Sequence, residues 1–167
     1  MKVWKIEKLW LSLVLFGFGI FGSLTPGMAQ QSVLTFQPAA ITNLAGTGVT
    51  ATASTAGDGG PGTSALVTGG MKGIVVDASG DVFFFDATAD VVRVIYEGGA
   101  AAAALITVEN PAVTAPVIGN IYLIAGVEFS TGTPGVNVLA AGAKFGTSNG
   151  GGLGIDAAGN LYYSGTA

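Results

Sequence analysis

The sequence predicts an all-β protein built from antiparallel sheets, which follows an N-terminal signal helix. Three observations support this prediction. The chain has 28 glycines and only 10% charged residues, a composition that favours strands and tight turns over amphipathic helices. An internal repeat carries short apolar runs separated by turn residues. The first segment has the charge and hydropathy pattern of an export signal.

Residues 1–29 are predicted to be a secretory signal peptide. The segment opens with three lysines, continues into an apolar run at 9–22 and ends in SLTPGMAQQ, so we expect cleavage after Ala29. An uncleaved anchor is the alternative, although the apolar run is shorter than the ~20 residues that a membrane-spanning helix needs. We therefore expect a secreted, periplasmic or cell-surface protein, in which residues 30–40 link the signal to the first repeat.

Charge and residue types exclude several classes of function. Without residues 1–29 the chain has three cationic and nine acidic side chains, which leaves no basic patch for nucleic acid or for an anionic membrane surface. The absence of Cys excludes disulfides, and the absence of His excludes common zinc sites and His-dependent triads. We expect no catalytic, cofactor-binding or metal-ligating residues and no cofactor, hence a binding protein rather than an enzyme.

Two copies of one pattern lie about eighty residues apart. KGIVVDASGDVFFFD (72–86) matches GGLGIDAAGNLYYSG (151–165), and ITNLAG (41–46) matches IYLIAG (121–126) in the same order. In each copy an apolar run predicts a strand, an Asp-Ala-x-Gly-Asp/Asn segment predicts a turn, and an aromatic run predicts the returning strand. The structural turn residues predicted for the repeat are Asp77, Gly80, Asp81, Asp156, Gly159 and Asn160.

Several short strands per repeat, with turn glycines at fixed offsets, are typical of a β-propeller blade. We expect a first blade at 41–96, an Ala-rich insertion at 97–120 and a second, truncated blade at 121–167. The insertion is interpreted as a surface segment between strands, with a hydrophobic docking segment as the alternative. Two repeats do not close a ring, so we expect an incomplete propeller whose remaining blades follow in a longer chain, with assembly of several short chains into one ring as the alternative.

The repeated pattern D-A-x-G-[ND]-[LV]-[FY]-[FY], preceded by AGTG (45–48) and GDGGPG (57–62), resembles the NHL repeats of secreted bacterial proteins. The resemblance covers roughly residues 41–167. It implies a propeller of the kind that binds proteins, RNA or glycans, and for this chain it implies an exported scaffold with a protein or glycan partner. The alternative is part of a propeller hydrolase or lactonase with a metal ion in the central channel, where several blades would supply the ligands.

The acidic residues of the first copy are interpreted as structural. A calcium cluster formed by Asp77, Asp81, Asp86 and Asp90 does not fit, because the spacing differs from that of a calcium loop. The second copy also has Asn in place of Asp81 and Gly in place of Asp86. Asp86 is instead expected to form a surface ion pair with Arg93 across neighbouring strands, worth ~0.2–1 kcal/mol.

The glycine-rich loops are interpreted as connections rather than ligand sites. AGTGVT lacks the G-K-[ST] ending of a phosphate-binding loop, and no helix pattern follows it. GDGGPGTSA (57–65) aligns with GVNVLAAGA (135–143), which lacks the acid at the position of Asp58. A metal or phosphate site shared by both copies would need that acid, so the loop identifies the repeat rather than a reaction.

Overall fold

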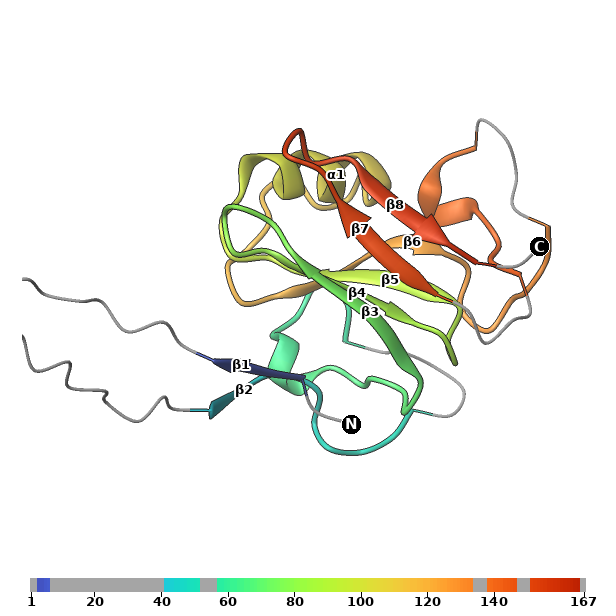
Figure 1. The fold of residues 1–167 in the computed structure, drawn as a ribbon. Coiled ribbons are helices and arrows are strands. Elements are labelled where there is room, and N and C mark those ends of the chain that lie inside the picture. Colours follow the sequence, from blue (N-terminus) through green and yellow to red (C-terminus); the bar gives the residue numbers. More distant parts are fainter. Residues whose placement is uncertain (1–2, 7–40, 52–56, 134–137, 147–150, 166–167) are drawn as a thin grey trace, which may run out of the picture. The chain divides into compact units, whose positions relative to one another are not determined.

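The structure, a computed structural model, describes residues 3–6, 41–51, 57–133, 138–146 and 151–165 (Figure 1). Strands β1 (Val3–Ile6) and β2 (Ile41–Ala45) form a two-stranded sheet. The predicted signal helix and its cleavage site fall largely on residues 7–29, which lie outside the described part of the chain. In the described ranges, no helix has the length and hydropathy needed to cross a membrane.

The central element is a four-stranded antiparallel sheet. Strands β3 (Met71–Val76), β4 (Val82–Asp86), β5 (Val91–Ile95) and β6 (Ile121–Gly126) pair in chain order. The strands are rich in β-branched and aromatic residues, which pack well on a pleated surface. A second antiparallel pair follows, β7 (Gly152–Ile155) and β8 (Leu161–Ser164). The predicted all-β class with antiparallel sheets is therefore confirmed at this level, with one α-helix added.

Strand β6 completes this sheet, although its sequence opens the second repeat. Ile121 pairs with Ile95 and Leu123 pairs with Arg93, so β6 occupies the free edge of β5. The sheet thus extends from Met71 to Gly126, across the repeat boundary predicted at residue 121. The boundaries of the sequence repeat and of the sheet are different.

The Ala-rich insertion contains a helix that packs against the sheet. Helix α1 (Ala100–Glu109) begins with five alanines, the residue with the highest helix propensity. Ala102 and Ile106 are buried in the same apolar cluster as Tyr122 and Ile124 of β6. The interpretation of a mere surface segment is therefore incomplete, because one side of the helix joins the core.

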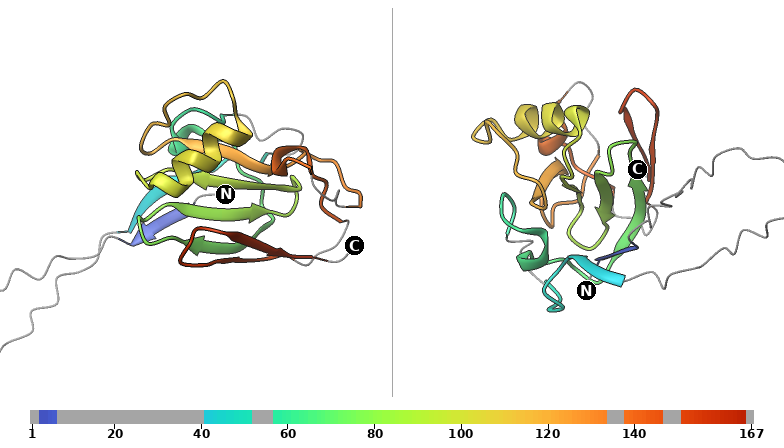
Figure 2. Two further views of the ribbon diagram at one scale, coloured as in Figure 1. Left: turned by 90° about the horizontal axis from the view of Figure 1, so that it is seen from above. Right: turned by 90° about the vertical axis from the view of Figure 1, so that its left-hand side faces the viewer.

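Different parts of the chain cover the two faces of the sheet (Figures 1 and 2). Phe83, Phe85, Val92 and Val94 face α1 and the β7–β8 hairpin. Alternate residues of the same strands point to the opposite face, as the two-residue period of a strand requires. There Val82, Phe84, Ile95 and Ile121 pack with Ala45, Ala65 and Val67. Both faces of the sheet are therefore apolar.

A short 3-10 helix recurs at matching positions of the two repeats. It spans Gly62–Ser64 in the first copy (η1) and Ala140–Gly142 in the second (η2). The residue before each helix has nearly the same conformation, with φ −55° and ψ 130° at Pro61 and φ −58° and ψ 141° at Leu139. The 3-10 helix and the residue before it thus keep their conformation although Pro61 is replaced by Leu139.

Candidate binding site

The turn between β3 and β4 is closed by an aspartate that bonds its own backbone. Asp77 Oδ1 accepts hydrogen bonds from the N–H groups of Ser79 at 2.8 Å and Asp81 at 2.9 Å. Gly80 donates its N–H to the carbonyl of Asp77 at 3.2 Å and has φ +95°, a conformation that glycine adopts without a steric cost. The segment therefore folds into this turn through interactions within five residues.

The turn between β7 and β8 has the same geometry. Asp156 Oδ1 accepts the N–H groups of Ala158 and Asn160, both at 2.9 Å, and Gly159 has φ +86°. The second carboxylate oxygen, Oδ2, accepts the Asn160 side-chain amide at 2.8 Å and the Tyr162 hydroxyl at 3.0 Å. These hydrogen bonds, above all those from Asn160, lower the pKa of Asp156 from 3.8 to about 2.

A recess of about 290 Å³ lies between the two turns. Asp77 and Asp156 line it from opposite copies of the repeat, and Ala101 of α1 contributes a third side. The remaining lining residues are small or aliphatic: Val76, Ala78, Ser79, Ile155, Ala157, Ala158 and Gly159. Three of the six predicted turn residues, Asp77, Asp156 and Gly159, thus line this recess, whereas Gly80, Asp81 and Asn160 do not.

Asp81 turns away from solvent and fixes the end of β5. Its side chain is buried, and its Oδ1 accepts the N–H of Glu97 at 2.5 Å. Burial raises the pKa of Asp81 above its usual value, while the bond from the Glu97 backbone acts in the opposite direction. Any side chain at Gly99 would overlap Asp81, so the start of α1 is fitted closely around this carboxylate.

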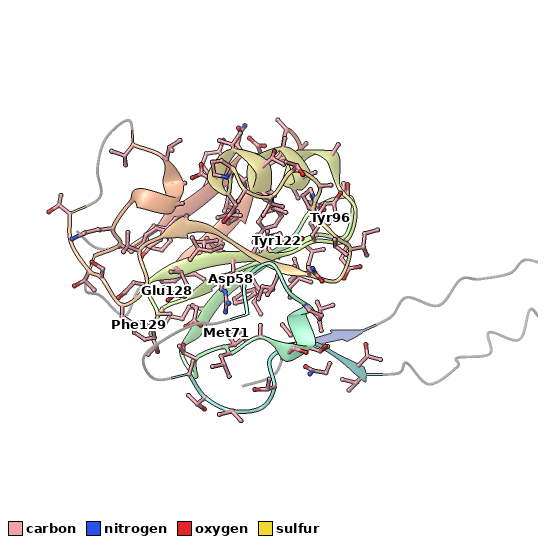
Figure 3. The ribbon with its side chains drawn as sticks, turned by 180° about the vertical axis from the view of Figure 1, so that it is seen from behind. Asp58, Met71, Tyr96, Tyr122, Glu128 and Phe129 are labelled. Carbon is pink, nitrogen blue, oxygen red and sulfur yellow. The ribbon has the colours of Figure 1, made fainter. Side chains whose placement is uncertain are left out.

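Asp58 of the loop GDGGPGTSA binds a buried arginine. Its Oδ1 accepts hydrogen bonds from Arg93 Nε at 2.9 Å and from Arg93 Nη2 at 2.6 Å. The Arg93 side chain is 0% exposed and that of Asp58 is 28% exposed, and Arg93 Nη1 also donates to the carbonyl of Leu66 at 2.7 Å. Figure 3 labels Asp58 over the sheet. Burial raises the pKa of Asp58, and the neighbouring guanidinium opposes that rise.

The backbone of this loop is hydrogen-bonded to the edge of β6. Gly59 donates its N–H to the carbonyl of Ile121 at 2.7 Å, and Ile121 donates to the carbonyl of Gly60 at 3.0 Å. Gly62 donates to the carbonyl of Gly119 at 2.9 Å. The acid and three glycines of the loop are thus engaged within the chain, which agrees with a connection rather than a phosphate site.

Asp86 has a different role from the one expected. The prediction of a surface ion pair between Asp86 and Arg93 is wrong. Both side chains are buried, and Arg93 forms an ion pair with Asp58. Asp86 Oδ2 accepts the N–H of Thr68 at 2.9 Å, and Oδ1 accepts the Thr68 hydroxyl. In the strand register Asp86 lies opposite Val91, whereas Arg93 lies opposite Phe84. The two side chains are therefore not direct cross-strand neighbours.

The sequence does not identify the partner of Arg93, although one feature indicates that a partner is needed. VVRVI places a cation inside an otherwise apolar strand, and a buried charge requires a partner. No spacing pattern in the sequence identifies which carboxylate pairs with Arg93. Within the described ranges, no three His, Cys, Asp or Glu side chains lie close enough together to hold a metal ion.

Asp156, which lines the recess, is poorly matched to proton transfer at neutral pH. General acid–base catalysis works best when the pKa of the catalytic group lies near the working pH, and Asp156, with a pKa of about 2, remains ionised. The chain has neither His nor Cys to supply another base or nucleophile. Comparisons with protein-family models, with curated proteins and with solved structures found no match.

Proposed function

We propose that this chain is an exported, non-catalytic scaffold of the NHL propeller type that binds a partner protein at the recess between its two turns. In this proposal the β3–β6 sheet is one blade and the β7–β8 hairpin begins the next. The observation that carries the proposal is the pairing of two equivalent Asp turns, Asp77 and Asp156, around one recess.

The size of the recess suits a single side chain of a partner. At about 290 Å³ it lies at the lower limit of small-molecule sites, which span roughly 300–1,000 Å³. Its walls combine alanines with aliphatic side chains, a surface against which a hydrocarbon stem can pack. A cofactor would need more volume and more polar contacts than these walls provide.

The charge of the recess selects a basic side chain. Asp77 and Asp156 carry the only charged groups among the lining residues, and Asp156 stays ionised because its pKa is lowered to about 2. The chain as a whole has a net charge of −4, which favours the approach of a cationic partner. A lysine or arginine would place its stem on the alanines and its cation between the carboxylates.

Binding of a basic side chain at the recess is tested by NMR titration of the isotope-labelled full chain. The probes are N-acetyl-lysine methylamide and N-acetyl-arginine methylamide, with N-acetyl-glutamate methylamide as the oppositely charged control. We expect shifts of the Ser79 and Ala158 amide signals with the two basic probes, at affinities on the order of 1 mM because exposed ion pairs contribute little. Equal shifts with the glutamate probe, or none with any probe, would contradict the proposal.

Two variants distinguish binding at the recess from general attraction by the acidic surface. Asp156→Asn keeps an oxygen that accepts backbone N–H groups but removes the charge, so it should weaken binding of the basic probes. Glu128→Gln removes one acidic charge from a residue outside the recess lining and should leave binding unchanged. Equal weakening by both variants would indicate general electrostatic attraction instead of a site.

Export is tested separately by N-terminal sequencing. The proposal expects the chain to be recovered outside the cytoplasm of an expressing bacterium, with Gln30 as its first residue. Recovery with Met1 intact in the cytoplasm would contradict the export part and leave the binding test unaffected.

A further inference from the structure

The two carboxylates of the recess differ in how many of their acceptor positions are already used. An ionised carboxylate has about four such positions, two on each oxygen. In Asp156, Oδ1 accepts the backbone N–H groups of Ala158 and Asn160. Its Oδ2 accepts the Asn160 side-chain amide and the Tyr162 hydroxyl. Asp156 therefore attracts a cation by its charge but has no acceptor position left for a hydrogen bond from a ligand.

Asp77 uses only one of its two oxygens. Oδ1 accepts the backbone N–H groups of Ser79 and Asp81, as the same oxygen of Asp156 does in the other turn. No hydrogen bond to Asp77 Oδ2 comes from the part of the chain that the structure describes. This oxygen is not one of the buried side-chain atoms that lack a partner, so it is open to solvent. The two carboxylates of the recess thus have their open acceptor positions on one atom, Asp77 Oδ2.

The difference between the turns follows from two positions of the repeat. Asn160, whose amide binds Asp156, corresponds to Asp81, and an ionised carboxylate has no hydrogen to donate. Tyr162, whose hydroxyl binds Asp156, corresponds to Phe83, which has no hydroxyl. The first copy therefore keeps the turn but lacks both side-chain donors.

We propose that the recess binds an arginine of the partner protein, whose guanidinium donates two hydrogen bonds to Asp77 Oδ2. The chain contains such a contact elsewhere, because Arg93 donates from Nε at 2.9 Å and from Nη2 at 2.6 Å to a single oxygen, Asp58 Oδ1. An arginine fills both open positions with one planar group, whereas a lysine ammonium donates one hydrogen bond to one oxygen. This inference rests on the proposed binding of a basic side chain and specifies which one.

The walls of the recess also favour a guanidinium over an ammonium. Ala78, Ala101 and Ala157 are among the lining residues and offer no hydrogen-bonding side chains to replace the water around a cation. A guanidinium is more weakly hydrated than an ammonium, so it loses less on entering such a recess. Asp156 contributes through its charge, since its pKa of about 2 keeps it ionised.

The inference is tested by comparing the affinities of N-acetyl-arginine methylamide and N-acetyl-lysine methylamide for the full chain in NMR titrations. The native chain should bind the arginine probe about threefold more tightly, the small factor expected for an exposed charged contact. The solution is kept at pH 8, because burial and, to a smaller extent, Asp77 raise the pKa of Asp81, and a protonated Asp81 would donate to Asp77.

Two substitutions at the recess should have different effects. Asp77→Asn should weaken binding of the arginine probe about fivefold and abolish the preference for it, because the Asn oxygen serves the turn and the amide nitrogen accepts no hydrogen bond. Asp156→Asn should weaken both probes about twofold and keep the preference, because it removes only a charge that acts at a distance.

Tyr162→Phe is the converse test, because it opens one acceptor position on Asp156 Oδ2. Tyr162 is 58% exposed, so the loss of its hydroxyl should leave the fold intact, and the arginine probe should bind about twofold more tightly. Tyr163→Phe is the matched control and should leave binding unchanged. The Tyr163 hydroxyl is buried and has no hydrogen-bond partner in the described ranges.

The outcomes distinguish this inference from the proposed function. Equal affinity of the native chain for the two basic probes would overturn the inference and leave the binding of a basic side chain standing. The same holds for loss of the preference in Asp156→Asn instead of Asp77→Asn, and for a Tyr162→Phe variant that binds like Tyr163→Phe. Binding of neither probe would overturn both. Far-UV circular dichroism verifies folding, and the two tyrosine variants decide the question if Asp77→Asn unfolds.

Discussion

Removing the carboxylate of Asp58 should strongly destabilise the fold, because this carboxylate forms an ion pair with a buried cation. Asp58→Ala eliminates the hydrogen bonds from Arg93 Nε at 2.9 Å and Nη2 at 2.6 Å and does not affect the bond from Nη1 to the Leu66 carbonyl. Arg93 is fully buried and lies on the face of β5 that packs against Ala65 and Val67.

The expected loss of unfolding free energy follows from the burial of Asp58 and Arg93. Breaking a fully buried ion pair by removing one partner costs about 3–5 kcal/mol. The Asp58 side chain is 28% exposed, so water can enter its place and hydrate part of the guanidinium. We therefore expect a loss of about 2–4 kcal/mol, which is a large fraction of the ~5–15 kcal/mol that stabilises a typical domain.

The assay is urea denaturation followed by far-UV circular dichroism, with linear extrapolation to water. The double variant Asp58→Ala/Arg93→Met should be more stable than Asp58→Ala alone, since it removes the buried cation together with the carboxylate that binds it. The raised pKa of Asp58 agrees with this order, because it shows that burial disfavours the charged carboxylate. A loss below ~0.5 kcal/mol for Asp58→Ala, or a double variant no more stable than it, would refute the reasoning.

Two further predictions concern the turns and the contact between the repeats. Gly73 has φ +61°, and Gly73→Ala places a Cβ in its tight contact with β7. We therefore expect the free energy of unfolding, measured by urea denaturation, to fall by about 2–4 kcal/mol. Gly154→Ala, where nothing lies within 4 Å of the added atom, should change stability by less than ~0.5 kcal/mol; equal losses would contradict the close approach at Gly73. Because the pKa of Asp156 is lowered from 3.8 to about 2, its contribution to stability is present above pH 3.8 and lost as the pH falls through about 2. Melting temperatures of the native chain and Asp156→Asn should therefore differ most near pH 6 and converge toward pH 2, and a constant difference would count against the lowered pKa.

The hairpins and their turns follow from short segments of sequence. Asp77 reaches the N–H groups of Ser79 and Asp81, and Gly80 supplies the positive φ, all within five consecutive residues. A carboxylate so close in the chain loses little conformational entropy when it bonds the backbone. The apolar runs on either side have few alternatives to pairing with each other, so the sequence predicts these strands.

The 3-10 helix of the glycine-rich loop is less dependent on its residues than the sequence indicates. GDGGPGTSA and its counterpart share little, yet each contains a 3-10 helix at the aligned position. In the second copy Glu109 of α1 accepts the N–H of Ala141 at 2.8 Å and holds η2 from outside the loop. The 3-10 helix of the second copy is therefore held in part by a side chain from outside the loop.

The sequence by itself determined the repeat, the antiparallel hairpins and the turn residues that close them, because these depend on neighbours a few positions apart. Only the tertiary structure decided that β6 completes the preceding sheet, that α1 joins the core and that Asp58 meets Arg93 across 35 positions of chain. Several carboxylates and several strand edges were available to make those contacts. The choice among them depends on how both faces of the sheet are covered at once, which no local pattern encodes.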